Sequence, residues 1–323
     1  MSRSTSEARK PSRVVLGLRA ARRLILYYFL VVLRAVVLVM PEQLAFALFR
    51  FLGDLAFVTV GVHRRRAIEH LRLAFPEISK SRARLIAKRM TRHLTRNAVE
   101  IIRFPKLSKE RILSMVTINR PDIAQEIARE GRGAIAMSAH IGNWELFAAA
   151  IAAMGYDITV VARKIYYEKF ESLLRATRRA AGVRVVYRDE PREILRALRN
   201  GHFLGVLADM DIEKLDSVYV EFFGRLALTP VGPVALALRT GVPLVPAFIV
   251  RNDRGGHTIL VEPPMHLVRT GDDQKDILVN AMRAAKIIER TIRRYPDQWM
   301  WMHRRWQHQP DWPFAQQPRQ SSP

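Results

Sequence analysis

The sequence predicts an α/β protein in which helices flank a mainly parallel central sheet, preceded by a hydrophobic helical membrane anchor. From Gly133 onward, short apolar segments alternate with helix-length segments across brief connections, which is the pattern of a parallel sheet covered on both faces. Several of the expected helices end at a glycine, the residue that most readily adopts the left-handed conformation of a helix terminus. The expected strands are 134–139, 158–163, 184–187, 203–208, 243–250 and 258–261, and the expected helices are 122–130, 144–154, 168–181, 190–200, 232–240 and 276–294.

Length and composition limit the possible domain organisation of the protein and the kinds of partner that it can bind. The 323 residues include 53 Lys and Arg against 30 Asp and Glu, a formal net charge of +23. Such an excess favours anionic partners, either nucleic acid or an anionic membrane surface with phosphorylated lipids, the alternative being a basic proteome or simple solubility. There is no cysteine, which excludes disulfides, thiolate metal sites and a cysteine nucleophile. We expect an N-terminal region over 1–62, a catalytic domain over 63–306 and a polar, disordered tail over 307–323.

The N-terminal region joins a strongly basic start to two apolar segments. The first, 24–40, is interrupted only by Arg34, and the second, 44–62, carries Arg50 and Asp54. A spanning helix needs about 20 apolar residues, so the first segment is marginal, and Arg34 suits a shallow helix whose charged end reaches the headgroups. We expect an anchor that spans the membrane or lies in its interface, the alternative being buried helices of a soluble domain. The basic run that follows, within 64–97, is expected to be a solvated helix face.

The strongest candidate for chemistry lies in the turn after the first strand of the expected sheet. Gly133 to Ala150 reads GAIAMSAHIGNWELFAAA, which places His140 at the carboxyl end of a strand and Glu145 at the start of a helix. Ligand sites in open α/β sheets lie at that end, and a histidine there can take a proton from a hydroxyl. The alternative is a histidine that closes the turn and a glutamate favoured at a helix N-terminus.

Charged residues follow two other expected strands. Arg163 could clamp a phosphate or polarise a carbonyl oxygen, whereas Arg178 and Arg179 on the next helix are expected to be solvated. Asp209 and Asp211 lack a clear third oxygen ligand, so we expect no metal. These aspartates would instead orient Arg163 or a polar group of a substrate.

Two later segments are distinctive. Phe222-Phe223-Gly224-Arg225 reads as an apolar turn, and Thr229-Pro230-Val231-Gly232-Pro233 as a helix start that suits an anion. The segment 295–306 carries three tryptophans among basic residues, which suits stacked nucleic acid bases or a membrane interface. The sequence contains no P-loop, Gly-x-Gly-x-x-Gly, Gly-x-Ser-x-Gly or zinc-binding spacing, and each absence removes a common enzyme class.

In this order the segments resemble the bacterial lipid A biosynthesis acyltransferases, the lauroyl/myristoyl family that adds secondary acyl chains to a lipid A precursor. The resemblance covers roughly 20–306, and Met210 departs from it because many members have glutamine there. Other members of the family use phosphatidylinositol mannosides or ornithine-type lipids. The matching pieces are the hydrophobic N-terminal helix, Arg64-Arg65-Arg66 with Phe75-Pro76-Glu77, His140 with Glu145, Arg163, Asp209-Met210-Asp211, Phe222-Phe223-Gly224, Thr229-Pro230, and Tyr295-Pro296-Asp297-Gln298-Trp299 with Arg304-Arg305-Trp306.

The resemblance implies a glycerolipid-acyltransferase-like fold and transfer of a fatty acyl group from acyl carrier protein to a lipid A hydroxyl. It makes His140 the general base and Glu145 the acid that orients it, with no metal, cofactor or covalent intermediate. It further implies a site on the cytoplasmic face of the inner membrane, with the carrier protein, a glycolipid and the anionic membrane surface, but no nucleic acid, as partners. Two alternatives are a glycerophospholipid or other lipid O-acyltransferase, and a non-catalytic basic protein that binds membranes or nucleic acid. Substrate-binding or oxyanion candidates are Asn143, Arg163, Asp209, Asp211, Phe223, Gly224, Arg225 and Thr229.

Overall fold

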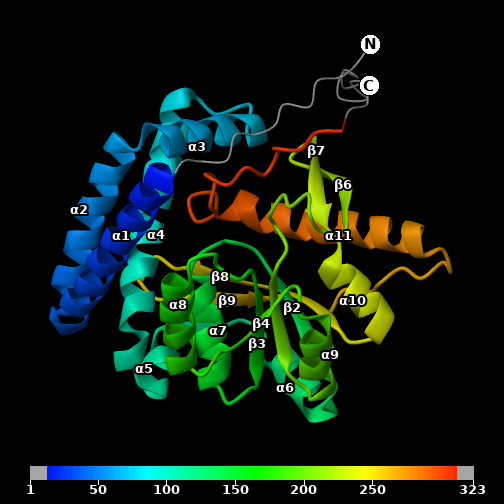
Figure 1. The fold of residues 1–323 in the computed structure, drawn as a ribbon. Coiled ribbons are helices and arrows are strands. Elements are labelled where there is room, and N and C mark those ends of the chain that lie inside the picture. Colours follow the sequence, from blue (N-terminus) through cyan, green and yellow to red (C-terminus); the bar gives the residue numbers. More distant parts are fainter. Residues whose placement is uncertain (1–12, 311–323) are drawn as a thin grey trace.

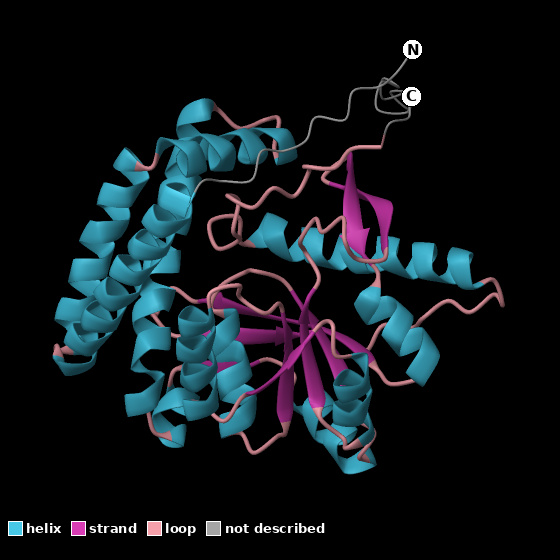
Figure 2. Cartoon of the chain, in the orientation of Figure 1, coloured by secondary structure: helices cyan, strands magenta, loops and turns pink. Residues whose placement is uncertain are grey.

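A computed structural model of the protein describes residues 13–310, and a seven-stranded sheet lies at its centre (Figures 1 and 2). The strand order is β1-β9-β8-β2-β5-β3-β4. The five strands from β8 to β4 run parallel, and β9 pairs antiparallel with β8. The prediction of a mainly parallel α/β sheet is therefore confirmed. The strands of this sheet are β1 (Val116–Ile118), β2 (Ala134–Ser138), β3 (Ile158–Ala162), β4 (Arg184–Tyr187), β5 (Phe203–Leu207), β8 (Leu244–Arg251) and β9 (His257–Val261).

The sheet is covered on both faces because its central strands are apolar on both sides. All residues of β8 are buried, and they alternate between two apolar layers. Phe248 and Val250 join the layer that includes the last two helices, whereas Ala247 and Ile249 join the layer of the helix after β2. The covering helices are α5 (Lys109–Ser114), α6 (Pro121–Glu130), α7 (Trp144–Ala153), α8 (Glu168–Ala180), α9 (Pro191–Arg199), α10 (Gly232–Thr240) and α11 (Asp273–Arg294).

A hairpin stands apart from the sheet against α11 (Figure 1). It consists of β6 (Ser217–Phe222) and β7 (Arg225–Pro230), which the sequence analysis anticipated only as a turn. Phe223 and Gly224 form the two-residue connection with φ of 54° and 72°, as a type I′ hairpin turn requires. The buried Phe223 holds this backbone in place, because its N–H donates to Glu289 on α11 at 2.8 Å.

Four N-terminal helices lie beside the sheet, with α1, α2 and α4 next to one another (Figure 1). They are α1 (Arg13–Val39), α2 (Glu42–Thr59), α3 (Gly61–Ala74) and α4 (Lys80–Arg103). Over 13–310, no single helix combines the length and apolar composition needed to cross a membrane, although α2 and α3 pass that test together as a pair bent by 84°. The expected second apolar segment, 44–62, is thus not one helix.

The apolar residues of α1 and α2 are only partly used for packing. Val37, Ala45 and Phe49 form a small buried cluster with Val99 of α4. On the remaining surface a large apolar face is exposed. It comprises Leu24, Ile25, Leu26, Tyr28, Phe29, Val32, Val36 and Val39 of α1, and Leu44, Phe51, Leu55 and Val58 of α2.

The expected domain boundaries can be located on the chain. The boundary after residue 62 falls inside α3, two residues after its start at Gly61. Of the tail expected to be disordered, 311–323 lies outside the described residues, as do the basic residues of 1–12.

Candidate active site

Pairing of β2 with β5 brings His140 next to Asp209. Ser138 lies opposite Leu207 in the parallel register, so the residues two positions further on meet just beyond the sheet. His140 Nδ1 is 2.7 Å from Asp209 Oδ1, and the His140 backbone N–H donates to Asp209 Oδ2 at 2.8 Å. One carboxylate therefore holds both the ring and the backbone of the histidine.

Asp209 is fully desolvated and remains ionised. Burial opposes its ionisation, but the charge and hydrogen bonds of His140, together with an N–H from Trp299, hold the pKa of Asp209 well below its usual range. Trp299 Nε1 donates to Asp209 Oδ2 at 2.7 Å. Burial would lower the pKa of His140, but the carboxylate of Asp209 outweighs it and raises that pKa above its ordinary value, with a smaller contribution from Glu145.

Glu145 does not contact the imidazole, contrary to its expected role of orienting His140. Its two oxygens accept hydrogen bonds from Arg178 on α8, at 2.9 Å from Nε and 2.6 Å from Nη2. The pair is largely buried, so the expectation that Arg178 is solvated is wrong. Glu145 ties α7 to α8, and the acid that orients the histidine in this structure is Asp209.

Two aromatic rings flank His140. The Trp144 ring meets it edge-on with centroids 5.0 Å apart, and the His303 ring lies at 4.9 Å. Burial, followed by the charge of His140, lowers the pKa of His303 to about 4, so that His303 is neutral beside the first histidine at neutral pH. No motif pointed to His303, because its nearness to His140 arises only from the folding of the chain after α11.

A buried polar network holds the turn between His140 and α7. Asn97 of α4 donates to the Gly142 carbonyl at 2.6 Å, and Gly142 has φ of +58° with no room for a Cβ, which would lie 2.0 Å from the Ile249 carbonyl oxygen. Asn143 caps α7 by accepting from the Leu146 N–H at 3.1 Å and donates to Glu100 at 2.8 Å. Because both ends of its amide are used within the protein, Asn143 acts on the turn rather than on a substrate.

Glu100 carries the charge of that network. Although burial opposes it, hydrogen bonds from His257 and Arg251 lower the pKa of Glu100 to about 2. Arg251 reaches Glu100 at 2.7 Å and Asn97 at 3.0 Å. This ion pair links α4 to the end of β8 directly beneath the turn that carries His140.

The tryptophan-rich segment 295–306 is mostly interior. Trp299 and Trp301 are fully buried, so the expectation that they stack on bases or lie in a membrane interface is wrong for both. Arg305 is also buried, donating to the Leu228 carbonyl and, at 2.6 Å, to Thr229 Oγ1. Burial lowers the pKa of Arg305 to about 10. Thr229 therefore holds the hairpin to this segment.

The other expected site residues form no hydrogen bond or ion pair with His140 within residues 13–310. Arg163 follows β3 and is exposed, with no hydrogen bond or ion pair to the residues of 13–310. Asp211 accepts from the N–H and ring of His308, at 2.9 and 2.6 Å. Phe223 packs against Arg293, 4.5 Å from the ring centroid, and Arg225 is exposed. Within the described part of the chain, no group of three or more His, Asp or Glu side chains has the arrangement of a metal site.

The arrangement suits general base chemistry. A carboxylate bound at Nδ1 requires the proton of a neutral imidazole to be on that nitrogen, which leaves the Nε2 lone pair as the acceptor. The same carboxylate then stabilises the imidazolium that forms when Nε2 takes a proton.

The chain is similar to known proteins over most of its length. The family model described as bacterial lipid A biosynthesis acyltransferase matches residues 17–308. The chain is 25% identical over 275 residues to the lipid A biosynthesis palmitoleoyltransferase of Escherichia coli (strain K12), covering 83% of this chain and 88% of that one. It is 25% identical to the lipid A biosynthesis myristoyltransferase of the same strain, covering 74% and 73%. A phosphatidylinositol mannoside acyltransferase of Mycobacterium tuberculosis (strain CDC 1551 / Oshkosh) is 27% identical over 48% of this chain and 51% of its own.

Proposed function

The chain belongs to the bacterial lipid A biosynthesis acyltransferase family, and we propose that it transfers a fatty acyl group from acyl carrier protein to a hydroxyl of a lipid A precursor. The observation that carries the proposal is the pairing of His140 with Asp209 at 2.7 Å, which leaves Nε2 as a proton acceptor. The site uses no cofactor in this proposal, because the thioester is already an activated acyl donor.

The reaction proceeds by direct attack. His140 Nε2 takes the proton of the acceptor hydroxyl as its oxygen bonds to the thioester carbonyl carbon. The tetrahedral intermediate collapses by breaking the carbon–sulfur bond, and the leaving thiolate takes the proton back from the imidazolium. Asp209 stabilises that imidazolium and keeps the ring oriented throughout.

Backbone N–H groups at the start of α7 are the proposed donors to the oxyanion. The N–H groups of Gly142 and Leu146 are already bonded, to the Gln298 carbonyl and to Asn143 Oδ1. Those of Trp144 and Glu145 have no acceptor among residues 13–310, and they lie at the positive end of the helix dipole. Donors fixed in this way stabilise a developing negative charge without reorganisation. Arg163 is the second candidate for donating a hydrogen bond to the oxyanion. Alternatively, it binds a phosphate of the acceptor.

Membrane attachment is proposed through the exposed apolar face of α1 and α2. Phe29 and Val32 are about 60% exposed on α1, as is Phe51 on α2, and gathered exposed apolar side chains are typical of surfaces that contact a partner or a membrane. Inserted into the interface of the inner membrane from the cytoplasmic side, this face would bring the site to its lipid acceptor. The net charge of +23 would attract anionic lipid and the acidic carrier protein, mainly by raising the association rate.

A second acceptor class follows from the relatives. Because one of them is a phosphatidylinositol mannoside acyltransferase, a different membrane glycolipid or a lysophospholipid is the alternative acceptor for the same histidine. Activity on lysophosphatidic acid without activity on a lipid A precursor would favour the alternative.

The test is turnover of purified protein with acyl carrier protein thioester and a lipid A precursor, followed by mass spectrometry of the product. His140→Ala should lose about 10²- to 10⁴-fold in rate, the usual contribution of general acid–base catalysis. The matched control is His266→Ala, which replaces an exposed histidine that has no role in the proposed mechanism. This variant should keep full activity. Near-normal turnover by His140→Ala would contradict the proposed mechanism.

A further inference from the structure

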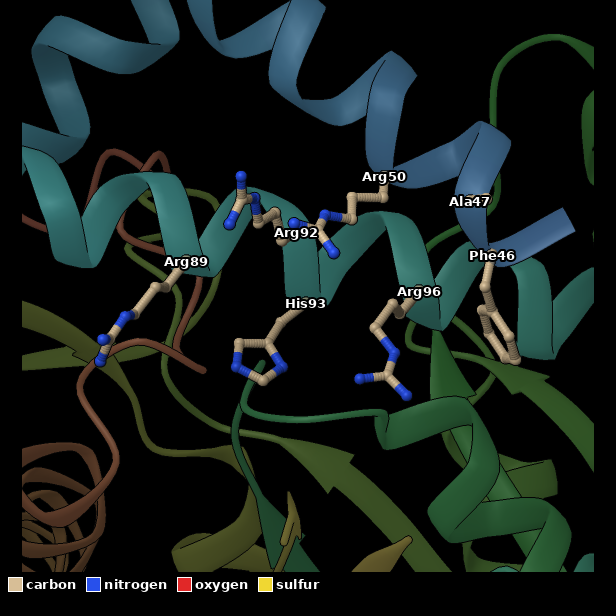
Figure 3. A pocket seen from close by; sticks show the side chains of 7 residues that line it. All are labelled: Phe46, Ala47, Arg50, Arg89, Arg92, His93 and Arg96. Carbon is tan, nitrogen blue, oxygen red and sulfur yellow. The ribbon is translucent and has the colours of Figure 1, made fainter. Parts of the chain in front are cut away.

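A basic cavity of about 480 Å³ lies between α2 and α4 (Figure 3). From the sequence, the basic residues of this part of α4 are expected to form a solvated helix face. In the structure several of them turn toward a shared space instead. The lining residues are Phe46, Ala47 and Arg50 from α2, and Arg89, Arg92, His93 and Arg96 from α4.

Only two of the basic groups in this cavity have an acidic partner. Arg92 is bonded to Asp54 at 2.8 and 2.7 Å, and His93 Nε2 is 3.8 Å from Asp297. Across residues 13–310, Arg50, Arg89 and Arg96 have no carboxylate within 4.0 Å. These three arginines therefore line the cavity without an ion-pair contact, and the carboxylates of Asp54, Asp297 and Glu100 act on them only from a longer distance.

Arg96 is the most constrained of the three. Its guanidinium lies 5.4 Å from the centroid of the Phe46 ring, a cation–π contact that fixes its direction. Burial and the charge of Arg251 lower the pKa of Arg96, although Glu100 opposes them. An anion bound in the cavity would offset both the burial of the Arg96 charge and its repulsion by Arg251.

The cavity and the candidate active site are connected through α4. Asn97, next to Arg96 in α4, donates to the Gly142 carbonyl at 2.6 Å. His93 contacts Asp297, two residues before the Trp299 that bonds Asp209. Helix α4 thus forms one wall of the cavity and also bonds the turn that carries His140.

The cavity and the exposed apolar face share helix α2. Leu44 and Phe51 of α2 are 58% and 64% exposed, and they flank the lining residues Phe46 and Arg50 in the sequence. A lipid whose headgroup lies among the arginines would find an apolar surface for its chains beside it.

We propose that this cavity binds the phosphate of an anionic membrane lipid, and that in the proposed acyl transfer it positions the phosphorylated acceptor. The guanidinium fork matches phosphate oxygens in a bidentate manner, and three unpaired forks offer more donors than a carboxylate would use. The acceptor role rests on the proposed function, whereas binding of lipid phosphate does not.

The binding test compares two doubly substituted proteins. Arg89→Gln/Arg96→Gln removes two charges from the cavity, and Lys80→Gln/Arg82→Gln removes two exposed charges from the first turn of α4. The full chain in a zwitterionic detergent is titrated calorimetrically with dihexanoylphosphatidic acid, dihexanoylphosphatidylcholine and inorganic phosphate. The first variant should bind phosphatidic acid at least about tenfold more weakly, since charge-assisted hydrogen bonds are lost, while the second changes less than about twofold by that measure.

Each other outcome overturns the proposal. Equal weakening in both variants means attraction by the overall charge, and no weakening in either means that the cavity binds no phosphate. Inorganic phosphate bound as tightly as phosphatidic acid means a site for the free ion rather than a lipid. Because removing mutually repelling charges should not lower the melting temperature of the unliganded protein, a marked fall in Arg89→Gln/Arg96→Gln would attribute lost binding to damaged structure and also contradict the proposal.

Kinetics separate this proposal from the proposed function. With a phosphorylated acceptor, Arg89→Gln/Arg96→Gln should raise KM about tenfold or more with kcat unchanged, and Lys80→Gln/Arg82→Gln should leave both unchanged. If His140→Ala is inactive while the cavity variant has normal kinetics, the acceptor role fails and the proposed function stands. If His140→Ala keeps its turnover, the proposed function fails, and the calorimetric result still decides whether lipid phosphate binds here.

Discussion

Asp209, and not Glu145, lies against His140: one carboxylate oxygen is 2.7 Å from Nδ1 and the other accepts the backbone N–H of the same residue at 2.8 Å. Glu145 is bound instead to Arg178. The acid that the family resemblance implies for His140 and the acid that binds it thus have separate tasks, one between two helices and one at the histidine.

Asp209→Asn should lower turnover by about 10²- to 10⁴-fold while the protein stays folded. An amide can satisfy the same hydrogen bonds with the ring in the wrong tautomer, and it cannot stabilise the imidazolium. The measurement is the steady-state rate of acyl transfer. Asp211→Asn is the matched control, because Asp211 is bound to His308 rather than His140, and a loss there as large as in Asp209→Asn would argue against the assignment.

Glu145→Gln should reduce the stability of the fold by about 3–5 kcal/mol, because it leaves Arg178 as an uncompensated and largely buried charge. The double variant Glu145→Gln/Arg178→Gln should recover a large part of that loss. Urea unfolding of the two single variants and the double variant measures the coupling. Additive losses would mean that the two side chains do not interact, whatever their distance.

The pH dependence of kcat/KM should have an acidic limb above pH 6.5, the ordinary histidine value. His140 acts as a base only when neutral, and its pKa is raised by Asp209 against the effect of burial, so activity is present above the raised pKa and lost as the pH falls through it. Asp209→Asn should move that limb to lower pH in whatever activity remains. A limb that stays in place would show that a different group titrates.

Gly142→Ala should destabilise the protein by at least about 2 kcal/mol more than Gly131→Ala. Both glycines have a left-handed backbone, with φ of +58° and +65°, but only at Gly142 would the new Cβ meet another atom, 2.0 Å from the Ile249 carbonyl oxygen. Thermal unfolding compares the two. Equal losses would mean that the turn carrying His140 has more freedom than this contact allows.

Reasoning from the sequence located the strands and helices of the alternating part of the chain. The expected strand over 184–187 coincides with β4, and the expected helix over 232–240 coincides with α10. Short elements outside the alternation were missed. Within the described chain, the three residues of β1 pair only with β9. The two strands of the β6–β7 hairpin pair only with each other in the same part of the chain. Neither β1 nor the hairpin therefore belongs to the alternation of strands and helices.

The sequence by itself determined the α/β class, the position of His140 at a strand end and the family of the protein, because periodicity, chain punctuation and ordered motifs are local properties. The tertiary structure decided which groups meet. Asp209 reaches His140 because β5 pairs with β2, and Trp299, far along the chain, completes that contact. The same holds for the arginine cavity, whose walls come from two helices. A residue's neighbours across a sheet or between helices depend on strand order and on which helix faces pack, and neither is encoded in the spacing of the residues themselves.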